Sequence, residues 1–314
     1  MSNNIFNVVI IGSGPAGHTS AIYLSRAGLA PLMLEGDCSN GLTSGGLLTT
    51  TKTVENYPGF PEGIDGYALT QLFRDQSLRF GTDIMSQNAT GIIKLHDGTF
   101  DVFTNSHVYR TKAIIISTGS TPKSLDIPGY KEYWHKGIST CAVCDGALPC
   151  FRKVPIAVVG GGDSACEEAL HLSHTASIVY LIHRGDKLRA SDIMQQRVFK
   201  NKKIVPIWNT QVLEVTGEDR VERLLLTNTK EKSTYNLEVK GLFVAIGHTP
   251  NSDFVKGLVH LDANGYIKTT PKGETNIPGI WAAGDVQDPH YRQAITAAGS
   301  GCVTALEVER WLHK

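Results

Sequence analysis

Two segments of the chain share one pattern, and this repeat constrains the fold more than any other feature. In each, a short apolar run leads into a glycine-rich turn and then a helix-compatible stretch: VVIIGSGPAG precedes HTSAIYLSRAG, and PIAVVGGGDSA precedes CEEALHLSHTA. Strand–turn–helix units of this kind bind dinucleotides. The pattern therefore predicts an α/β fold with two Rossmann-like dinucleotide-binding domains.

The spacing of small residues gives each turn its role. The first turn carries Gly12, Gly14 and Gly17; the second carries Gly160, Gly162 and Ala165, with Asp163 and Ser164 between the last two. The first glycine makes the turn, the second lets the backbone approach a pyrophosphate, and the third small residue lets helix and strand pack closely. We expect the phosphates to lie on backbone N–H groups at the helix N-terminus, where the dipole favours anions.

The two second strands end differently. Eighteen residues after the last small residue of each fingerprint come Glu35, which closes APLMLEG, and His183, which opens HRGDKLRAS. A carboxylate accepts hydrogen bonds from the hydroxyls of a ribose, whereas the cluster containing Arg184 and Arg189 would pair with a 2′-phosphate. The first site is thus predicted to hold a dinucleotide with free ribose hydroxyls and the second to hold NADPH; alternatively, the two arginines only solvate a loop.

The segment STCAVCDG raises three interpretations: a metal clip, a redox couple or a chance pair. Its cysteines are Cys141 and Cys144, and Asp145 follows at once. A structural zinc site needs four ligands, but no second CxxC exists, and the remaining cysteines are scattered: Cys38, Cys150, Cys166 and Cys302. We therefore expect no metal and favour a redox couple.

The composition of the chain limits which partners and which location are expected. Thirty basic and thirty acidic residues cancel, and 41% of residues are apolar, so neither nucleic acid nor an anionic membrane is an expected partner. The beginning MSNNIFNVVIIG lacks the features of a signal or transit peptide, and no apolar run of about 18 residues could span a bilayer. These features favour the cytoplasm, where persistent structural disulfides are rare.

A cofactor for the first site follows from the chemistry of the other two sites. NADPH gives two electrons together as hydride, whereas a disulfide is reduced through thiolates. A flavin converts between the two, and FAD suits a dinucleotide site that ends in an acidic residue. FAD is therefore predicted to bind at the first site and to pass its electrons to the CxxC.

The ordered set of motifs also resembles one family. GSGPAG, GGLLTTT, VENYPGF, CAVCDG, GGGDSA, AIGHTPN and AAGDVQD are similar to the low-molecular-weight thioredoxin reductases, most closely to fungal and other eukaryotic members. The resemblance implies an FAD domain over 1–117 and 247–314, with an inserted NADPH domain over 118–246 that carries the CxxC. It also implies that the protein is a homodimer and that thioredoxin is its protein substrate. The breaker-rich TGSTP and IGHTPN fit the two crossings between domains.

The resemblance also implies site residues. The FAD contacts would be Ser13, Gly14, Pro15, Ala16, Glu35, Asn56, Asp285, Arg292, Gln293 and Ala294, and the last three should begin a helix. Two positions depart from the family pattern: Leu47 stands where a Gln is usual, and Gly185 stands where the NADPH motif has a second Arg. With Leu47 the pattern implies one flavin-side hydrogen bond fewer, and Gly185 leaves the 2′-phosphate with fewer donors and so a weaker preference for NADPH over NADH.

Roles at the CxxC follow from the same resemblance. Cys144 would face the flavin, Cys141 would attack the disulfide of thioredoxin, and Asp145 would act as general acid, unless it is only a helix or turn cap. His248 is a second candidate for proton transfer, although it could equally be a packed histidine. The predicted function is a thioredoxin-disulfide reductase. The alternatives are a flavin-dependent dithiol oxidase and a non-catalytic nucleotide-binding sensor.

Overall fold

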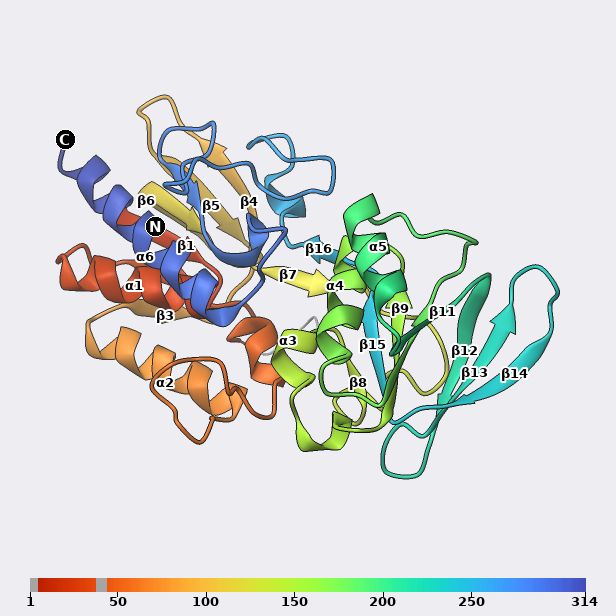
Figure 1. Ribbon diagram of the computed structural model, residues 1–314. Helices are drawn as coiled ribbons and strands as arrows, with labels where there is room; N and C mark the ends of the chain where they lie inside the picture. Colours follow the sequence, from red (N-terminus) through yellow and green to blue (C-terminus); the bar gives the residue numbers. More distant parts are fainter. Residues whose placement is uncertain (1–4, 38–43) are drawn as a thin grey trace. The chain divides into compact units, whose positions relative to one another are not determined.

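The computed structural model describes residues 5–37 and 44–314 and divides the chain into two compact units. The first unit is formed by Met1–Thr121 together with Thr249–Lys314, and the second by Pro122–His248. The domain boundaries expected from the sequence, after residues 117 and 246, lie a few residues before these. Each unit is built on its own sheet of parallel or mostly parallel strands, together with helices (Figure 1), and the predicted α/β fold with two Rossmann-like domains is confirmed.

The first unit contains a seven-stranded sheet. Its strands are β1 (Phe6–Ile11), β2 (Leu32–Leu34), β3 (Asp83–Met85), β4 (Ala89–Lys94), β5 (Phe100–Thr104), β6 (Val108–Ile116) and β17 (Ile280–Ala282). The order is β3-β2-β1-β6-β5-β4, and β17 pairs with β6. The strands β3, β2, β1, β6 and β17 are parallel, while β5 and β4 are antiparallel additions. The C-terminal part of the chain therefore completes a sheet that the N-terminal part begins.

Helices of the first unit pack through small residues. They are α1 (Pro15–Arg26), α2 (Gly66–Arg79) and α6 (Ala294–Leu312), with 3₁₀ turns η2 (Gly46–Thr50), η4 (Asp253–Val255) and η5 (Gly284–Val286). A Cβ placed on Gly301 of α6 would come within 2.3 Å of the Ala16 carbonyl oxygen of α1. Ser20 donates a hydrogen bond to the Gly301 carbonyl across the same contact, at 3.0 Å. The close approach of these two helices thus needs glycine at position 301.

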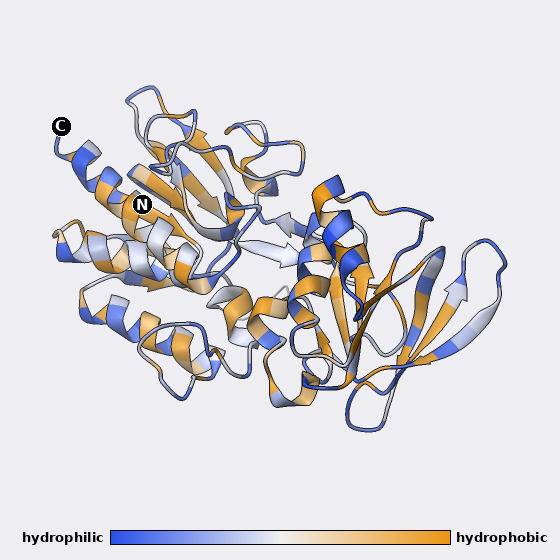
Figure 2. Cartoon of the chain, viewed as in Figure 1, coloured by the Kyte–Doolittle hydropathy of each residue, from blue (hydrophilic) through white to orange (hydrophobic). Residues whose placement is uncertain are grey.

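The central strands supply the core. Val8, Val9 and Ile10 of β1 are fully buried, as are Ile114 and Ile115 of β6. Figure 2 shows the central strands of the parallel sheets coloured mostly as hydrophobic, whereas the loops are largely hydrophilic. Removing each such side chain from water contributes roughly 1.5–3 kcal/mol, and strands buried on both faces are typical of parallel α/β sheets.

The second unit contains two sheets. Its strands are β8 (Ile138–Ser139), β9 (Pro155–Gly160), β10 (Ile178–Ile182), β11 (Ile204–Ile207), β12 (Thr210–Thr216), β13 (Arg223–Asn228), β14 (Thr234–Glu238) and β15 (Gly241–Ala245). The parallel sheet has the order β11-β10-β9-β15-β8, and β12, β13 and β14 form an antiparallel meander. The helices are α3 (Ala142–Asp145), α4 (Asp163–Leu172) and α5 (Asp192–Lys200), with the 3₁₀ turn η3 (Pro149–Phe151).

Two short strands carry the chain between the units. β7 (Ser120–Pro122) and β16 (His248–Pro250) pair with each other as a two-stranded sheet. Next to this pair, the Lys123 N–H donates to the Gly247 carbonyl at 3.0 Å. Both crossings fall within or directly beside the breaker-rich segments TGSTP and IGHTPN. Across residues 5–37 and 44–314, no helix combines the length and apolar character that a bilayer span requires.

Candidate redox and nucleotide sites

The first glycine-rich turn is shaped by the packing of its own backbone. β1 ends at Ile11, and Gly12 follows with φ of +107°, where a Cβ would come within 2.4 Å of the Ser117 carbonyl oxygen. A Cβ on Gly17 would approach the Gly12 carbonyl oxygen to 2.1 Å. Helix α1 begins at Pro15, whose fixed φ suits the first helical position. The first and third glycines are therefore required by the protein itself.

The second glycine of each turn faces open space instead. The nearest atom that a Cβ on Gly14 would meet is the Gly45 carbonyl oxygen at 3.7 Å, and a Cβ on Gly162 would meet nothing within 4 Å. Gly14 and Gly162 are the N-caps of α1 and α4, so a side chain on either would occupy space at the helix start. The residues present thus fit a pyrophosphate lying against the backbone at both turns.

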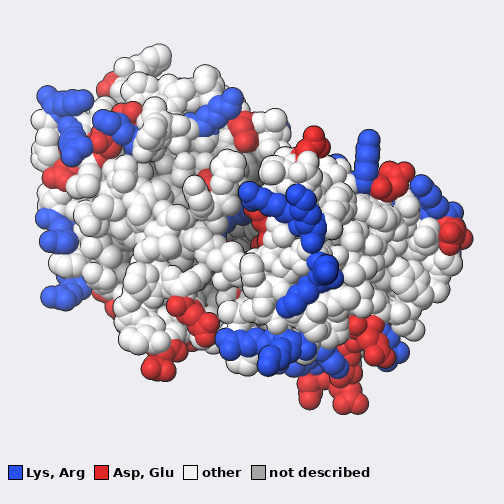
Figure 3. All heavy atoms as spheres, viewed as in Figure 1, with Lys and Arg blue, Asp and Glu red and all other residues white. Residues whose placement is uncertain are grey.

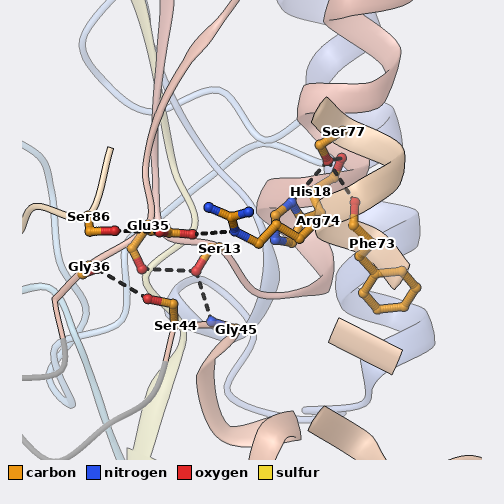
Figure 4. Close-up of polar contacts among 10 residues, drawn as sticks. All are labelled: Ser13, His18, Glu35, Gly36, Ser44, Gly45, Phe73, Arg74, Ser77 and Ser86. Atoms are coloured by element: carbon orange, nitrogen blue, oxygen red, sulfur yellow. Dashed lines mark hydrogen bonds and ion pairs between the residues drawn. The ribbon is translucent and has the colours of Figure 1, made fainter. Parts of the chain in front are cut away.

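Glu35 follows β2 directly and is held from several directions (Figure 4). Its side chain accepts a hydrogen bond from Arg74 Nε of α2 at 3.1 Å and one from Ser86 Oγ at 2.6 Å, and the residue is only 8% exposed. Ser13 Oγ donates to the Glu35 carbonyl at 2.9 Å and accepts from the Gly45 N–H at 2.9 Å. The carboxylate proposed for a ribose thus has a defined position beside the first fingerprint.

A buried histidine lies next to this group. His18 of α1 has its Nδ1 3.0 Å from Ser77 Oγ of α2. Burial lowers the pKa of His18 to about 4, with Arg74 adding to that effect and Glu35 opposing it. His18 is therefore neutral near pH 7 and adds no positive charge beside Glu35.

Residues from the C-terminal part of the chain meet the first fingerprint. A Cβ on Gly284 would come within 2.9 Å of the Ala16 Cβ, so η5 packs against the start of α1 and brings Asp285 there. Burial raises the pKa of Asp285 to about 6; Asp288 adds to the rise and Arg292 opposes it.

Asn56 also reaches this region. Its Nδ2 donates to Gln293 Oε1 at 3.2 Å, and Gln293 is the N-cap of α6 in a capping box. Arg292, just before it, has φ of +48°. The predicted helix start at Ala294 is confirmed, and two positions far apart in sequence lie in contact.

The second turn is tied to the loop after β10. A Cβ on Gly161 would meet the His183 ring at 2.2 Å, and His183 Nδ1 lies 3.1 Å from the Gly160 carbonyl oxygen. The Arg189 N–H donates to the Gly161 carbonyl at 2.6 Å. His183 is thus buried beneath the turn, whereas Arg184 and Arg189 are exposed. Asp163 is also engaged, since its Oδ1 accepts from the Ser191 N–H and Oγ, each at 2.8 Å.

Cys141 and Cys144 form a disulfide at the short helix α3. Cys141 is the N-cap of this helix, and its Sγ accepts from the Cys144 N–H at 3.1 Å. Val143, between the two cysteines, is 52% exposed. Cys141 and Cys144 are themselves half-buried, and the N–H that donates to Cys141 Sγ would favour a thiolate there.

Asp145 lies beside this pair and is half-buried. Burial raises its pKa, whereas a hydrogen bond from Ser139 and the charge of His135 lower it. Ser139 Oγ donates to Asp145 Oδ2 at 2.5 Å. The histidine that acts on Asp145 is His135, which no sequence pattern marks. His248, the histidine expected from the sequence, is half-buried at the end of the second unit.

Several site residues carried no sequence signal. Arg74, Ser86 and His135 lie outside every motif, whereas Ser139 lies in STCAVCDG and Glu168 in the helical stretch after the second fingerprint. Packing brings these five residues to the sites. Of the other cysteines, Cys166 is fully buried, Cys150 and Cys302 are half-buried, and Cys38 lies outside the described residues. Over residues 5–37 and 44–314, no group of three or more His, Cys, Asp or Glu side chains could hold a metal ion.

Comparisons with known proteins agree with this arrangement. Residues 6–301 match the family described as pyridine nucleotide-disulphide oxidoreductase. A thioredoxin reductase of Debaryomyces hansenii is 51% identical, covering 98% of each chain. A mitochondrial thioredoxin reductase 2 of Saccharomyces cerevisiae is 50% identical over 97% of this chain and 91% of that protein.

A solved structure extends the likeness to three dimensions. The crystal structure of thioredoxin reductase from Streptococcus pyogenes MGAS5005 has a TM-score of 0.91 and 37% identity, and the match covers 99% of both chains. Sequence and fold are therefore shared over almost the whole length. The chain belongs to the pyridine nucleotide-disulphide oxidoreductase family and, within it, to the thioredoxin reductases.

Proposed function

We propose that this protein reduces thioredoxin with electrons from NADPH, using FAD and the Cys141–Cys144 disulfide. The observation that carries the proposal is the disulfide at the start of α3, with Asp145 beside it, in the unit that also contains the second fingerprint. When bound, FAD supplies the link between hydride and thiol chemistry, because it accepts two electrons together and passes them to a disulfide.

The first unit is the proposed FAD domain. Gly14 offers an open backbone to the pyrophosphate, and Glu35 offers acceptors to the ribose hydroxyls. The remaining proposed contacts are Gly12, Ser13, Pro15, Ala16, Gly17, Asn56, Asp285, Arg292, Gln293 and Ala294. The contacts of Ser13 with Glu35, of Asn56 with Gln293 and of Gly284 with Ala16 support one common site.

The second unit is the proposed NADPH domain. Gly160, Gly162, Asp163, Ser164 and Ala165 would form the pyrophosphate turn. Exposed Arg184 and Arg189 would supply charge to the 2′-phosphate, and His183 would act by supporting the turn from below. The backbone bond from Arg189 to Gly161 supports this role, because it fixes the basic loop relative to the turn.

The chain's own residues carry out disulfide exchange. The Cys141 thiolate attacks one sulfur of the thioredoxin disulfide, the S–S bond breaks, and Asp145 protonates the thiolate that leaves. Cys144 then attacks the Cys141 sulfur and gives its proton to the departing thioredoxin sulfur, which re-forms the Cys141–Cys144 disulfide and releases the second thioredoxin thiol. Two electrons thus pass from the reduced cysteine pair to thioredoxin, together with one proton from Asp145 and one from Cys144. His248 stays a proposed second group for proton transfer.

Assembly and location are also proposals. A homodimer is supported by exposed apolar side chains on two helices of the first unit: Tyr67 and Leu72 on α2, and Ile295 and Val303 on α6. A cytoplasmic location stays a proposal, and tagging would test it against the mitochondrion, which the name of one relative specifies. The chain has thirty basic and thirty acidic residues, and both signs appear on the face drawn in Figure 3; this balance fits a protein substrate better than nucleic acid.

One assay separates the proposed function from its alternatives. NADPH is added to the purified flavoprotein without oxygen, and the flavin absorbance is followed; oxidised thioredoxin is then added. Bleaching followed by recovery supports the reductase. Bleaching by a dithiol but not by NADPH, followed by oxygen uptake once air is admitted, would instead identify an oxidase. No change with either reductant would identify a sensor.

A further inference from the structure

Ser139 occupies a fixed, buried position next to the cysteine pair. It is the last residue of β8, pairs with Phe243 of β15 in the parallel sheet, and is 3% exposed. The chain leaves the sheet here and reaches Cys141 two residues later. The Ser139 hydroxyl is therefore positioned by the sheet and not by the mobile end of a loop.

This hydroxyl joins the two groups that the exchange reaction needs. Ser139 Oγ accepts a hydrogen bond from the Cys141 N–H at 3.1 Å and donates one to Asp145 Oδ2 at 2.5 Å. An amide N–H can only donate, so the single hydroxyl proton is free to point at the carboxylate. The two bonds form a continuous chain from the backbone of the attacking cysteine to the proposed general acid.

The direction of the second bond matters for proton transfer. A hydroxyl that donates to a carboxyl oxygen stabilises the ionised form more than the neutral form. Asp145 becomes ionised when it gives its proton to a departing thiolate, so Ser139 favours the state reached after the transfer. It also keeps Asp145 next to the pair.

Other groups act on Asp145 as well. His135, in the loop before β8, contributes a positive charge that lowers the pKa of Asp145, while burial raises it. Glu168 of α4 accepts a hydrogen bond from the Ala142 N–H at 2.5 Å and so brings a second carboxylate to the same short helix. Ser139 is the neutral donor in this group, and its removal changes no charge.

We propose that Ser139 is a positioning residue for disulfide exchange: its hydroxyl ties the Asp145 carboxyl to the backbone of Cys141 and sets the pH at which Asp145 gives up its proton. This inference rests on the proposed function, which assigns Asp145 as the acid. It names a residue that contacts neither thioredoxin nor a cofactor in the proposed reaction and acts through Asp145.

The first test compares Ser139→Thr with Ser139→Val, which differ only in the hydroxyl. Infrared difference spectra of the oxidised holoenzyme against pH give the midpoint of the Asp145 carboxyl band, which is identified by its loss in Asp145→Asn. We expect the Val variant to raise this midpoint by about one pH unit, since a hydrogen bond to a charged group is worth about that much. The Thr variant should restore the native midpoint.

The second test is kinetic. In the Val variant we expect the turnover number for thioredoxin to fall about tenfold, part of the range for general acid catalysis. The alkaline limb of its pH profile should move upward, the KM for thioredoxin should stay constant, and Thr should rescue both changes. Ser173→Ala is the control, because Ser173 is a buried serine of the same unit that bonds the Leu170 carbonyl.

The outcomes separate the two proposals. An unchanged Asp145 midpoint in the Val variant would overturn the role of Ser139, even with lowered activity. The same holds if Ser173→Ala shifts the pH profile equally, since a general loss of packing would then explain both. A wild-type protein that does not reduce thioredoxin would instead overturn the proposed function, while the infrared midpoint would still report on Ser139.

Discussion

Arg74 Nε lies 3.1 Å from Glu35 Oε2, so the carboxylate proposed for the ribose is already ion-paired by a residue of α2. Glu35 is largely shielded, with a side chain 5% exposed, whereas that of Arg74 is 33% exposed. Ser86 occupies the other carboxylate oxygen from a different segment. The acceptor is therefore held in one geometry before any ligand arrives, which reduces the entropy lost on binding.

Arg74→Ala should weaken FAD binding. Without the guanidinium the Glu35 carboxylate loses a charge-assisted hydrogen bond and its defined orientation. We expect the dissociation constant for FAD to rise about tenfold, measured by the recovery of free-flavin fluorescence on dilution. Arg79→Ala on the same helix is the control, since Arg79 lies over the Phe80 ring. Equal losses in both variants would mean that helix stability, not Glu35, is responsible.

Substituting the two cysteines by serine should have different effects on the reaction with thioredoxin. Cys144→Ser leaves Cys141 free to attack oxidised thioredoxin but removes the resolving thiol, so a stable mixed disulfide should accumulate. Cys141→Ser should give none. Non-reducing electrophoresis with mass analysis of the cross-linked species distinguishes them, and a trapped complex in Cys141→Ser would show that the assigned roles are reversed.

Asp285 should make the stability of the FAD-free protein depend on pH. Its pKa is raised by burial from the usual 3.8 to about 6. The folded state therefore binds more protons than the unfolded state in this interval, and the free energy of unfolding should fall as pH rises from about 4 to about 6, by roughly 3 kcal/mol at most. Urea unfolding at several pH values measures this.

Asp285→Asn is the matching variant for that measurement. It should flatten the pH dependence and stabilise the FAD-free protein at pH 7, because no buried charge has to form. It should also weaken FAD binding, since a carboxylate accepts from the ribityl hydroxyls better than an amide. A pH profile of stability that is unchanged by the substitution would contradict the assignment.

Gly185→Arg should tighten NADPH binding and leave NADH almost unchanged, because only NADPH carries the 2′-phosphate. A Cβ at position 185 would lie 3.1 Å from His183 Nε2, so the ring must shift slightly. Gly185→Gln introduces the same contact without the charge and is the control. A KM for NADPH that does not fall in the Arg variant relative to the Gln variant would place the 2′-phosphate elsewhere.

The sequence predicted the parts of the sites that are formed by residues close together in the chain. The apolar runs and glycine spacing identified β1 with α1 and β9 with α4, because a strand, a tight turn and a helix start leave a local pattern. The positions of Glu35 and His183 after β2 and β10 were predicted from the spacing of eighteen residues that separates each from the last small residue of its fingerprint. The role of His183 was only partly anticipated, since its ring lies under Gly161.

Contacts set by tertiary packing left no such pattern. Arg74 and Ser86 approach Glu35 from α2 and from the segment after β3, and their spacing from Glu35 in sequence carries no signal. His135 affects Asp145 across a bend before β8. The antiparallel meander of β12, β13 and β14 also went unpredicted, because its short half-buried strands lack a glycine fingerprint.

The pairing of β7 with β16 has a consequence for how such a chain can be assembled from parts. The Lys123 N–H and the Gly247 carbonyl are joined by one hydrogen bond, so the beginning and end of the second unit are neighbours. A block of residues whose ends meet can be inserted into, or removed from, another domain at a single point on its surface. The host then keeps the register of its own sheet, as β17 does when it returns to β6.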